Sequence, residues 1–592
     1  MKEGPRKRTR VEHKHIKAST PISPKTVLKT VEKTDADDDS KKQWKIKGLD
    51  LLQQLTAAHK SNHNDLGLFV SRMSAHCLED VSPWKSMVYA ASKAGNVIYR
   101  LALKYSTPEA RLAYFDLFVQ PVREGTKHSV FLDLISSSTG KFFSQSLLKY
   151  SHRNQAKVFF RELGQEAKSL INSANGVETL NYAYVLSQRC KGLSLSKKDI
   201  NQLIARLMLS PVALVHDQQV FEKDIRSTLV NFRDNKDPEL QKTFAVSIKQ
   251  LRNYLTKLLD KNSHRLRIVM WMLSIYCDVV DDALKEEIAT IMFMTDDEES
   301  KFAVGEMAQH PEGLEVLTSL VGVMTARMKR RMLSAFKRYN RLPNLPFSAA
   351  GSAFLARYLM TLDDSKVALE VLTPFLTCCG TPEDCLLRRI LFHEWGHQFL
   401  LFILDPTHSQ VFTPPLTRAR LLAPAPTTLK DDASRLQGMR AAVKSALLDF
   451  FVKHLKVKAD VDFVFKEKIG QKILLVAMST DNDDDIEAAV LAIFDRRGSG
   501  ALSPDHLFNS LIFRKVVHAL DSKGPISDDF MSLVQKHLQT LLQSEGAAAL
   551  RFLWTSKPEN QEWLKKIGIQ QALKKGDLGE RGQVLAKVVN ST

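Results

Sequence analysis

The stretch that decides the fold is Ser137-Ser138-Thr139-Gly140-Lys141-Phe142-Phe143-Ser144-Gln145-Ser146-Leu147-Leu148-Lys149-Tyr150. It places a glycine behind small polar residues and then repeats apolar residues at steps of three and four, the spacing of an amphipathic helix. Several neighbouring copies of this arrangement lie 36 to 45 residues apart, which is the period of stacked helical repeats. The copies are centred on Gly95, Gly140, Gly176, Gly313, Gly351, Gly396, Gly470 and Gly546.

These repeats predict an all-α protein, because helical spacing runs from Gly48 onward without a convincing run of alternating strands. A single repeat cannot bury its apolar side, so successive repeats are expected to stack into an α-solenoid. The length fits about ten or eleven repeats. We expect the solenoid to be bent, or L-shaped, near residues 190–250, where the period is least clear.

The repeat residues resemble Pumilio-type (Puf) repeats, and most closely those of the nucleolar Puf-A branch. Residues 137–185 carry most of the likeness, residues 393–406 match a late repeat of that branch, and residues 430–590 look like its C-terminal region. The resemblance implies a right-handed α-solenoid of Puf-like repeats. It also implies an RNA-binding factor of the nucleus and nucleolus that holds pre-rRNA during large-subunit ribosome assembly, alongside other pre-ribosomal proteins.

Five segments are expected along the chain. Residues 1–48 are polar, with 14 basic and 7 acidic residues, and predict a disordered basic tail. Residues 49–190 and 191–404 are expected to hold N-terminal and central Puf-like repeats. Residues 405–430 contain five prolines and predict a Pro-rich loop, because proline ends helices. Residues 431–592 are expected to hold C-terminal repeats.

The charge of the chain indicates its class of partner. The 592 residues are 44% hydrophobic, enough to bury a core, and have a net charge of +18. A polyanion is therefore the expected partner, with nucleic acid first. Within the tail, a basic cluster is a candidate nuclear-import signal, although a solvated tail would have the same composition. The cluster comprises Arg6, Lys7, Arg8 and Arg10.

Membrane insertion is not expected, because charged and histidine side chains interrupt even the densest apolar run, residues 386–404. We also expect no small-molecule substrate. The six cysteines form no paired framework, which favours a reducing compartment. Cys378, Cys379 and Cys385 lack the spacing of a zinc ribbon and are interpreted as buried thiols.

Two motifs imitate metal sites. His393-Glu394-Trp395-Gly396-His397 matches a zinc-protease pattern, but a third ligand is missing and the repeat register places His393 before a helix. Residues 495–506 imitate a calcium loop with Arg497 and His506 where carboxylates are needed. We therefore expect no metal, no cofactor and no catalytic residue, with a zinc hydrolase as the weakest alternative.

Basic side chains on the helices that follow each break are the positive signal for nucleic acid. Lys141, Gln145 and Lys149 share one helix face, with Phe142 and Phe143 expected on the core-facing side. Such side chains would contact phosphates without selecting a sequence. The RNA-binding candidates are Arg100, Lys104, Lys141, Gln145, Lys149, Arg153, Lys157, Arg265, Arg267, Lys329, Arg330, Arg331, Lys472, Arg514 and Lys515.

Sequence-specific Puf repeats read one base each through side chains that follow the repeat glycine. The matching positions here include Asn96, Lys141, Phe142, Asn181, Glu315, Ser352 and His397. Only Gln145 fits the role of reading a base edge. We therefore expect mostly nonspecific recognition of the RNA backbone. A translational regulator that binds mRNA and a helical-repeat scaffold that holds a peptide are the alternatives.

Overall fold

In the computed structural model, the described residues are 35–60, 66–78, 82–119, 130–189, 197–216, 224–294, 297–377, 385–405, 415–450, 528–544 and 546–591, with 470, 473 and 517 as isolated positions. Within these ranges the secondary structure is α-helical with two short 3-10 helices and no strand, which confirms the all-α prediction. None of these helices is long and apolar enough to cross a membrane.

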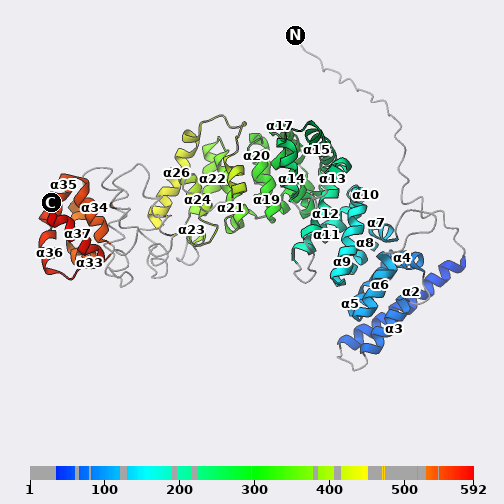
Figure 1. Ribbon diagram of the computed structural model, residues 1–592. Helices are drawn as coiled ribbons and strands as arrows, with labels where there is room; N and C mark the ends of the chain where they lie inside the picture. The colour runs from blue at the N-terminus through cyan, green and yellow to red at the C-terminus, as the bar shows by residue number, and fades with distance from the viewer. Residues whose placement is uncertain are drawn as a thin grey trace, which may run out of the picture. The chain divides into compact units, whose positions relative to one another are not determined.

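The chain forms two compact units (Figure 1). Unit 1 comprises residues 1–162, 173–179 and 190–194, and unit 2 comprises residues 163–172, 180–189 and 195–592. Each unit is built from rows of helices that pack side by side.

In unit 1, the long helix α2 (Asp35–Lys60) packs against α5 (Lys93–Tyr105), and α5 packs against α8 (Gly140–Tyr150). A second layer contacts this row and contains α3 (Leu66–Leu78), α4 (Pro83–Ala90), α6 (Pro108–Val119) and α7 (Val130–Ser136). The core between them is aromatic: the ring centroid of Tyr99 lies 5.3 Å from those of Phe118 and Phe143. Helix α9 (Arg153–Gln165) follows, then α10 (Ala167–Leu170), which belongs to unit 2, and α11 (Ala174–Arg189), whose first residues belong to unit 1 and whose remainder belongs to unit 2.

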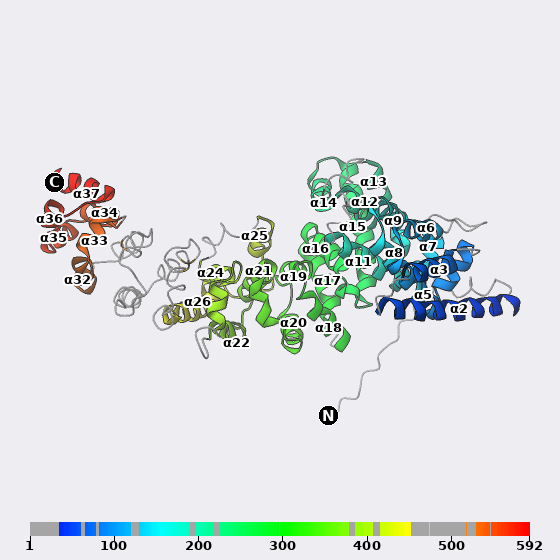
Figure 2. The same ribbon diagram turned by 90° about the horizontal axis from the view of Figure 1, so that it is seen from below.

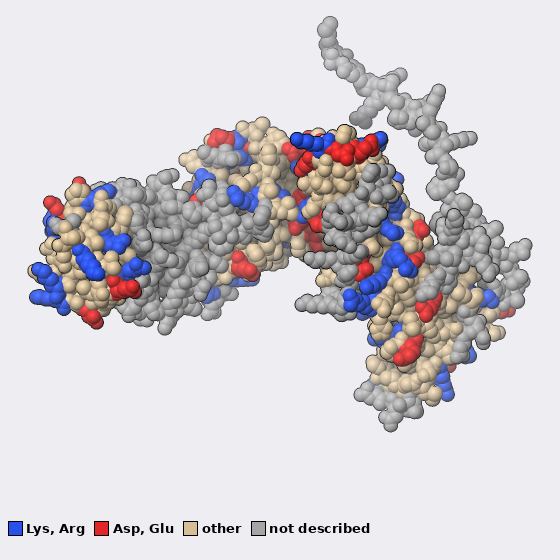
Figure 3. Space-filling model, in the orientation of Figure 1, with Lys and Arg blue, Asp and Glu red and all other residues tan. Residues whose placement is uncertain are grey.

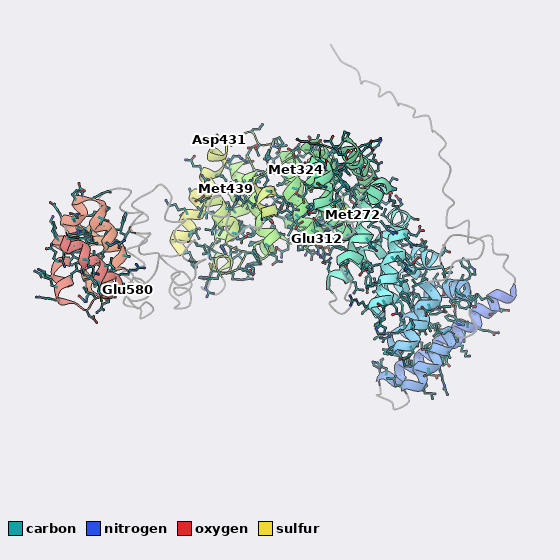
Figure 4. All side chains as sticks on the ribbon, in the orientation of Figure 1. Met272, Glu312, Met324, Asp431, Met439 and Glu580 are labelled. Carbon is teal, nitrogen blue, oxygen red and sulfur yellow. The ribbon has the colours of Figure 1, made fainter. Side chains whose placement is uncertain are left out.

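Unit 2 repeats the arrangement over a longer row. Consecutive contacts join α16 (Arg267–Val279), α19 (Pro311–Leu320), α21 (Ala349–Met360), α24 (Gln398–Leu404) and α26 (Asp432–Asp449). Buried side chains such as Met272, Met324 and Met439 fill the space around this row (Figure 4). The other elements of this stretch are α12 (Lys197–Met208), α13 (Pro211–His216), α14 (Ile225–Asp234), α15 (Pro238–Leu259), η3 (Ser263–Arg265), α17 (Asp282–Met294), α18 (Glu298–Met307), α20 (Ala326–Arg338), η4 (Leu342–Phe347), α22 (Ser365–Leu376), α23 (Leu386–Leu391) and α25 (Pro415–Leu422).

The C-terminal helices form their own small core, with Trp554 buried between α34 and its neighbours. They are α32 (Asp528–Lys536), α33 (Leu538–Gln543), α34 (Ala547–Ser556), α35 (Pro558–Lys566), α36 (Ile569–Lys575) and α37 (Glu580–Ser591).

The repeat glycines are required by close backbone packing. A Cβ added at any of five of them would lie closer than 3.0 Å to the carbonyl oxygen of the residue six positions earlier, where real Cβ atoms are essentially never found. The preceding helix therefore ends directly against the start of the next, and only glycine leaves room for that carbonyl. The five are Gly95, Gly140, Gly313, Gly351 and Gly396.

The serine three residues before the glycine has a matching role. Its Oγ accepts a hydrogen bond from the glycine N–H, at 2.7 to 3.1 Å in four copies. This bond satisfies one of the free N–H groups at a helix start. The serines are Ser92, Ser137, Ser173 and Ser348. The Ser-x-x-Gly pattern thus encodes a helix start that is capped by serine and opened by glycine.

Helix α2 corrects the prediction of a disordered tail over residues 1–48, because it begins at Asp35. The indole of Trp44 stacks on the rings of His76, Tyr89 and Tyr99, with centroids 4.8, 4.5 and 5.5 Å away. Its Nε1 donates to the His76 carbonyl at 3.2 Å. This aromatic contact joins the polar segment to the repeats.

The Pro-rich segment and one cysteine also depart from expectation. Residues 405–430 contain helix α25, which packs on α19 and α21 instead of forming only a loop. Cys77 and Cys277 are buried free thiols, and burial raises the pKa of each to about 12. Cys385 is buried, as expected, but it is disulfide-bonded, so its interpretation as a thiol is wrong. Cys378, Cys379 and residues 495–506 lie outside the described residues.

Candidate nucleic-acid interface

Helices α5 and α8 of unit 1 expose a strip of side chains that we call the α5–α8 surface. It consists of Val97, Arg100 and Lys104 from α5 and of Phe142 and Lys149 from α8, all exposed. The two apolar members are 43% and 42% exposed, respectively. Proteins that bind single-stranded nucleic acid combine exposed aromatic rings, which stack on the bases, with cations, which contact the phosphates.

Phe142 was expected to face the core, and the structure places its ring in solvent instead. The guanidinium carbon of Arg100 lies 6.0 Å from the ring centroid, and the Lys141 ammonium lies 5.2 Å from it. The Arg100 Nε also donates to the Ser146 hydroxyl at 3.3 Å, which holds the guanidinium beside the ring. Phe142 precedes Gln145 by three residues and Lys149 by seven, which is the spacing of residues on one face of a helix. This spacing was the sequence signal that Phe142 shares the exposed face with them.

Two tyrosines extend the strip. The Lys104 ammonium lies 4.8 Å from the Tyr105 ring centroid, and the Lys149 ammonium lies 5.5 Å from that of Tyr150. In the part of the chain that the structure describes, none of the three exposed cations of the α5–α8 surface forms an ion pair with a carboxylate. Their charge is therefore available to phosphates.

Helix α9 carries further predicted contacts. Arg153 is exposed and Lys157 is half-buried. The helix packs on α7 through the rings of Phe131 and Phe159, 4.6 Å apart. Figure 3 shows blue Lys and Arg side chains gathered over α8 and α9. Gln145, the predicted base reader, is half-buried on α8.

Lys141 does not belong to the exposed set. Its side chain is buried, and its ammonium forms an ion pair with Glu178 from α11. A cation that is desolvated and paired in this way has little charge left for a phosphate. The prediction placed Lys141 outside and Phe142 inside, and the structure shows the reverse.

Three of the five predicted cations of unit 2 that the structure describes are engaged within the protein. The Lys329 ammonium is buried and donates to the Thr361 carbonyl at 2.7 Å, and burial lowers its pKa to about 8. Lys329 therefore leaves the set of candidate phosphate contacts. Arg267 donates to Glu312 at 3.3 Å, and Arg331 donates to the Phe293 carbonyl at 2.7 Å.

Two of the unit 2 candidates remain exposed. Arg265 lies on η3, and Arg330 lies on α20 with Asp364 3.9 Å away. The remaining candidates, Arg6, Lys7, Arg8, Arg10, Lys472, Arg514 and Lys515, lie outside the described residues.

The positions that would read bases hold the repeats together instead. The Asn96 amide donates to the Thr139 carbonyl at 2.7 Å, which joins α5 to the start of α8. The Asn181 side-chain oxygen accepts from the Ile268 N–H at 3.1 Å, and the Ser352 hydroxyl accepts from the Phe399 N–H at 3.1 Å. Polar groups used in this way are not free to select a base.

The zinc-protease pattern is not on a helix. Helix α24 begins at Gln398, so His393 precedes it, as the repeat register predicts. The Nδ1 of His397 lies 2.9 Å from the His393 carbonyl oxygen, and His393 Nδ1 accepts from the Trp395 N–H. Over the described ranges, no group of three His, Cys, Asp or Glu side chains is placed to hold a metal ion.

The sequence prediction missed a basic surface on the C-terminal helices. Four exposed lysines occupy the last turns of α35 and α36, where positive charge is favourable at helix C-termini. They are Lys565, Lys566, Lys574 and Lys575. The sequence signal for this surface was available as two Lys-Lys pairs that lie nine residues apart.

Rows of stacked helices that begin at a capped glycine define an α-solenoid of Puf-like repeats. The solved structure of human Puf-A has this fold, with a TM-score of 0.64 and 14% identity over 94% of this chain and 100% of that chain. Human Puf-A in complex with DNA gives 0.62 and 15% over 94% and 100%. At these identities the likeness establishes the fold. No protein-family model and no curated protein sequence matches the chain.

Proposed function

We propose that this protein binds single-stranded RNA, mainly through its phosphate backbone, and that the α5–α8 surface is a principal contact. The observation that carries the proposal is the exposed Phe142 ring beside Arg100. The same strip holds the exposed Lys104 and Lys149, which form no ion pair with a carboxylate among the described residues. The DNA complex of human Puf-A, which has the same fold, supports a nucleic-acid partner.

The mechanism is non-covalent. The three cations would contact successive phosphates, release their counterions and make the affinity fall with salt. Phe142 would stack on one base without selecting it, because every base has a π-face. The absence of free side chains at most base-reading positions of the described repeats favours low sequence preference. We expect neither a cofactor nor an enzymatic step.

The biological role that fits best is that of a nucleolar factor of large-subunit ribosome biogenesis, which holds pre-rRNA. The Puf-A-like fold supports this role, and so does the basic cluster at Arg6 to Arg10, which suits nuclear import. Proteins of the pre-ribosomal particle are then the expected neighbours.

Crosslinking the protein to RNA in cells and sequencing the bound RNA tests this role. Dominant reads from pre-rRNA would support it. Reads scattered over mRNAs would favour a translational regulator, and recovery of little RNA would contradict RNA binding altogether. A variant with Arg100, Lys104 and Lys149 replaced by alanine is the matched control, because its crosslinking should fall while its fold is retained.

A helical-repeat scaffold is the second candidate function, because one specific observation favours it. Unit 2 holds residues 415–430 of its own chain, which include helix α25, against the row of helices that corresponds to the base-reading row.

A further inference from the structure

Residues 415–430, which we call the strap, cross the helix row of unit 2. The strap comprises α25 and the chain that follows it, and α25 contacts both α19 and α21. Figure 2 shows α25 beside the row that contains these helices. In the resemblance to Puf repeats, this row is the one that would face the bases.

Arg420 anchors the strap in an acidic site. Its side chain is buried, with Nε 2.9 Å and Nη2 2.7 Å from the two carboxylate oxygens of Asp278, a bidentate pair. Its Nη1 lies 3.2 Å from the Glu315 carboxylate, and its Nη2 donates to the Ser274 hydroxyl at 3.1 Å. Planar, bidentate contacts of this kind recognise a guanidinium rather than an ammonium group.

The helix row also recognises the backbone of the strap. Arg357 donates to the carbonyls of Leu421 and Pro424, both at 2.9 Å. The Asp363 carboxylate accepts from the N–H groups of Leu429 and Lys430 at 3.0 and 3.2 Å. These contacts hold the backbone at the end of α25 and in the irregular chain that follows it, whatever the side chains are.

Apolar burial contributes little to this attachment. Among strap residues whose side chains are described, only Arg420 and Leu421 are buried. Leu416, Leu422 and Leu429 are 40%, 50% and 92% exposed. A segment that turns three of its four leucines to solvent and its arginine inward is held as a ligand is held, not as part of a core.

The charge of the site disfavours nucleic acid. Glu315 stands at one of the positions where Puf repeats contact a base, and Asp278 lies beside it on α16. Arg226 also pairs with Asp278 at 2.8 Å. The Arg226 guanidinium also lies 3.9 Å from the Glu315 carboxylate. Without the strap, the two carboxylates still outnumber this one guanidinium, which disfavours a phosphate backbone and favours a cationic peptide.

We propose that the α16–α19–α21 row is a peptide-binding surface for an arginine-bearing segment that forms one short helix and continues as irregular chain, and that the strap is its resident ligand, bound in cis. Tethering gives the strap an effective concentration of about millimolar, so it excludes free peptide from the site. This inference does not depend on RNA binding, because its readout is the binding of peptide.

The test uses the full chain and a fluorescent peptide of residues 415–430 added in trans. The wild-type chain is expected to show no saturable binding. A chain with Arg420→Ala has a weakened strap and is expected to bind the peptide. A peptide with the same Arg420→Ala change should bind this chain about 10- to 100-fold more weakly, because it lacks the charged hydrogen bonds. A chain that also carries Glu315→Gln should lose affinity in parallel.

A folded Arg420→Ala chain that binds no peptide would overturn the proposal. If the Arg420→Ala chain does not fold, hydrogen exchange of the wild type tests instead whether the strap detaches from the helix row. Exchange of the Leu429 and Lys430 amides by local opening, before the amides of α21, is the expected result. Exchange of these two amides only on global unfolding would show that the strap is an integral part of the fold.

Discussion

Single residues in this protein are constrained most tightly where a repeat begins. A methyl group at Gly351 would meet the carbonyl oxygen of Leu345, which belongs to the backbone and cannot rotate away. Gly351→Ala should therefore lower the free energy of unfolding by about 1–3 kcal/mol, the usual cost of overpacking. Urea unfolding of the full chain measures the change.

Gly438 provides the matched control for this substitution. It is exposed in the middle of α26, and an added Cβ would meet no atom within 4 Å. Gly438→Ala should raise stability by about 0.5–1 kcal/mol, because alanine is the better helix former. Two substitutions with the same sign would contradict the close-packing explanation of the repeat glycine.

His264 makes a residue-level prediction about pH. The ring is fully buried, and neither nitrogen has a hydrogen-bond partner among the described residues. Burial, with a smaller effect from Arg265 and an opposing one from Asp297, lowers its pKa from 6.5 to about 4. The unfolded chain therefore binds the proton first, and stability falls as pH drops from 6.5 to about 4.

The full loss from His264 is about 3 kcal/mol, from a pKa difference of roughly 2.5. Thermal or urea unfolding between pH 7 and pH 4 measures it. His264→Leu should flatten the pH dependence over this window. An unchanged slope in the variant would show that other groups are responsible.

Neighbouring residues on α8 show where prediction from sequence ends. The helix, its start at Gly140 and its basic character were predictable from periodicity and the Ser-x-x-Gly pattern. Which of Lys141 and Phe142 faces solvent was not, because Lys141 is drawn inward by Glu178, 37 residues away in the next repeat. Local sequence contains no information about that partner.

At the scale of elements, the paired surface of α5 and α8 predicts a separable contribution from stacking. Phe142→Ala should weaken binding of single-stranded RNA by about 5- to 150-fold, the effect of losing one stacked base. Its salt dependence should stay unchanged, because no charge is removed. Fluorescence anisotropy at two salt concentrations measures both quantities.

Phe302→Ala is the control for stacking, since Phe302 on α18 is 38% exposed, similar to Phe142. This variant should bind RNA as the wild type does. Equal losses in both variants would indicate a general effect of surface aromatics and would contradict a specific role for α8.

The sequence did not predict the elements whose position depends on side chains far away in the chain. The polar composition before residue 48 hid α2, which depends on the stacking of Trp44 against three rings from α3, α4 and α5. Proline density suggested a loop at 405–430. The attachment of this segment through Arg420 depends on Asp278, 142 residues earlier, and no local pattern encodes that pairing.

At the scale of the whole molecule, the net charge is +18, but the cations in different parts of the chain have different roles. Several cations of unit 2 are used in internal pairs, as Arg267 and Arg420 are, whereas those of the α5–α8 surface have no carboxylate partner among the described residues. Removing charge at the two places should therefore have different effects. Arg267→Ala should reduce stability, whereas Lys149→Ala should reduce RNA affinity and leave stability nearly unchanged.

The most direct test of the account is the salt dependence of RNA binding by the full chain, measured with several single strands of unrelated sequence. The predicted result is a linear fall of log affinity with log salt, with similar slopes for every sequence. Replacing Arg100, Lys104 and Lys149 by alanine should make the slope shallower by about 2, at roughly 0.7 per phosphate contact. A slope near zero, or binding restricted to one sequence motif, would contradict recognition of the RNA backbone.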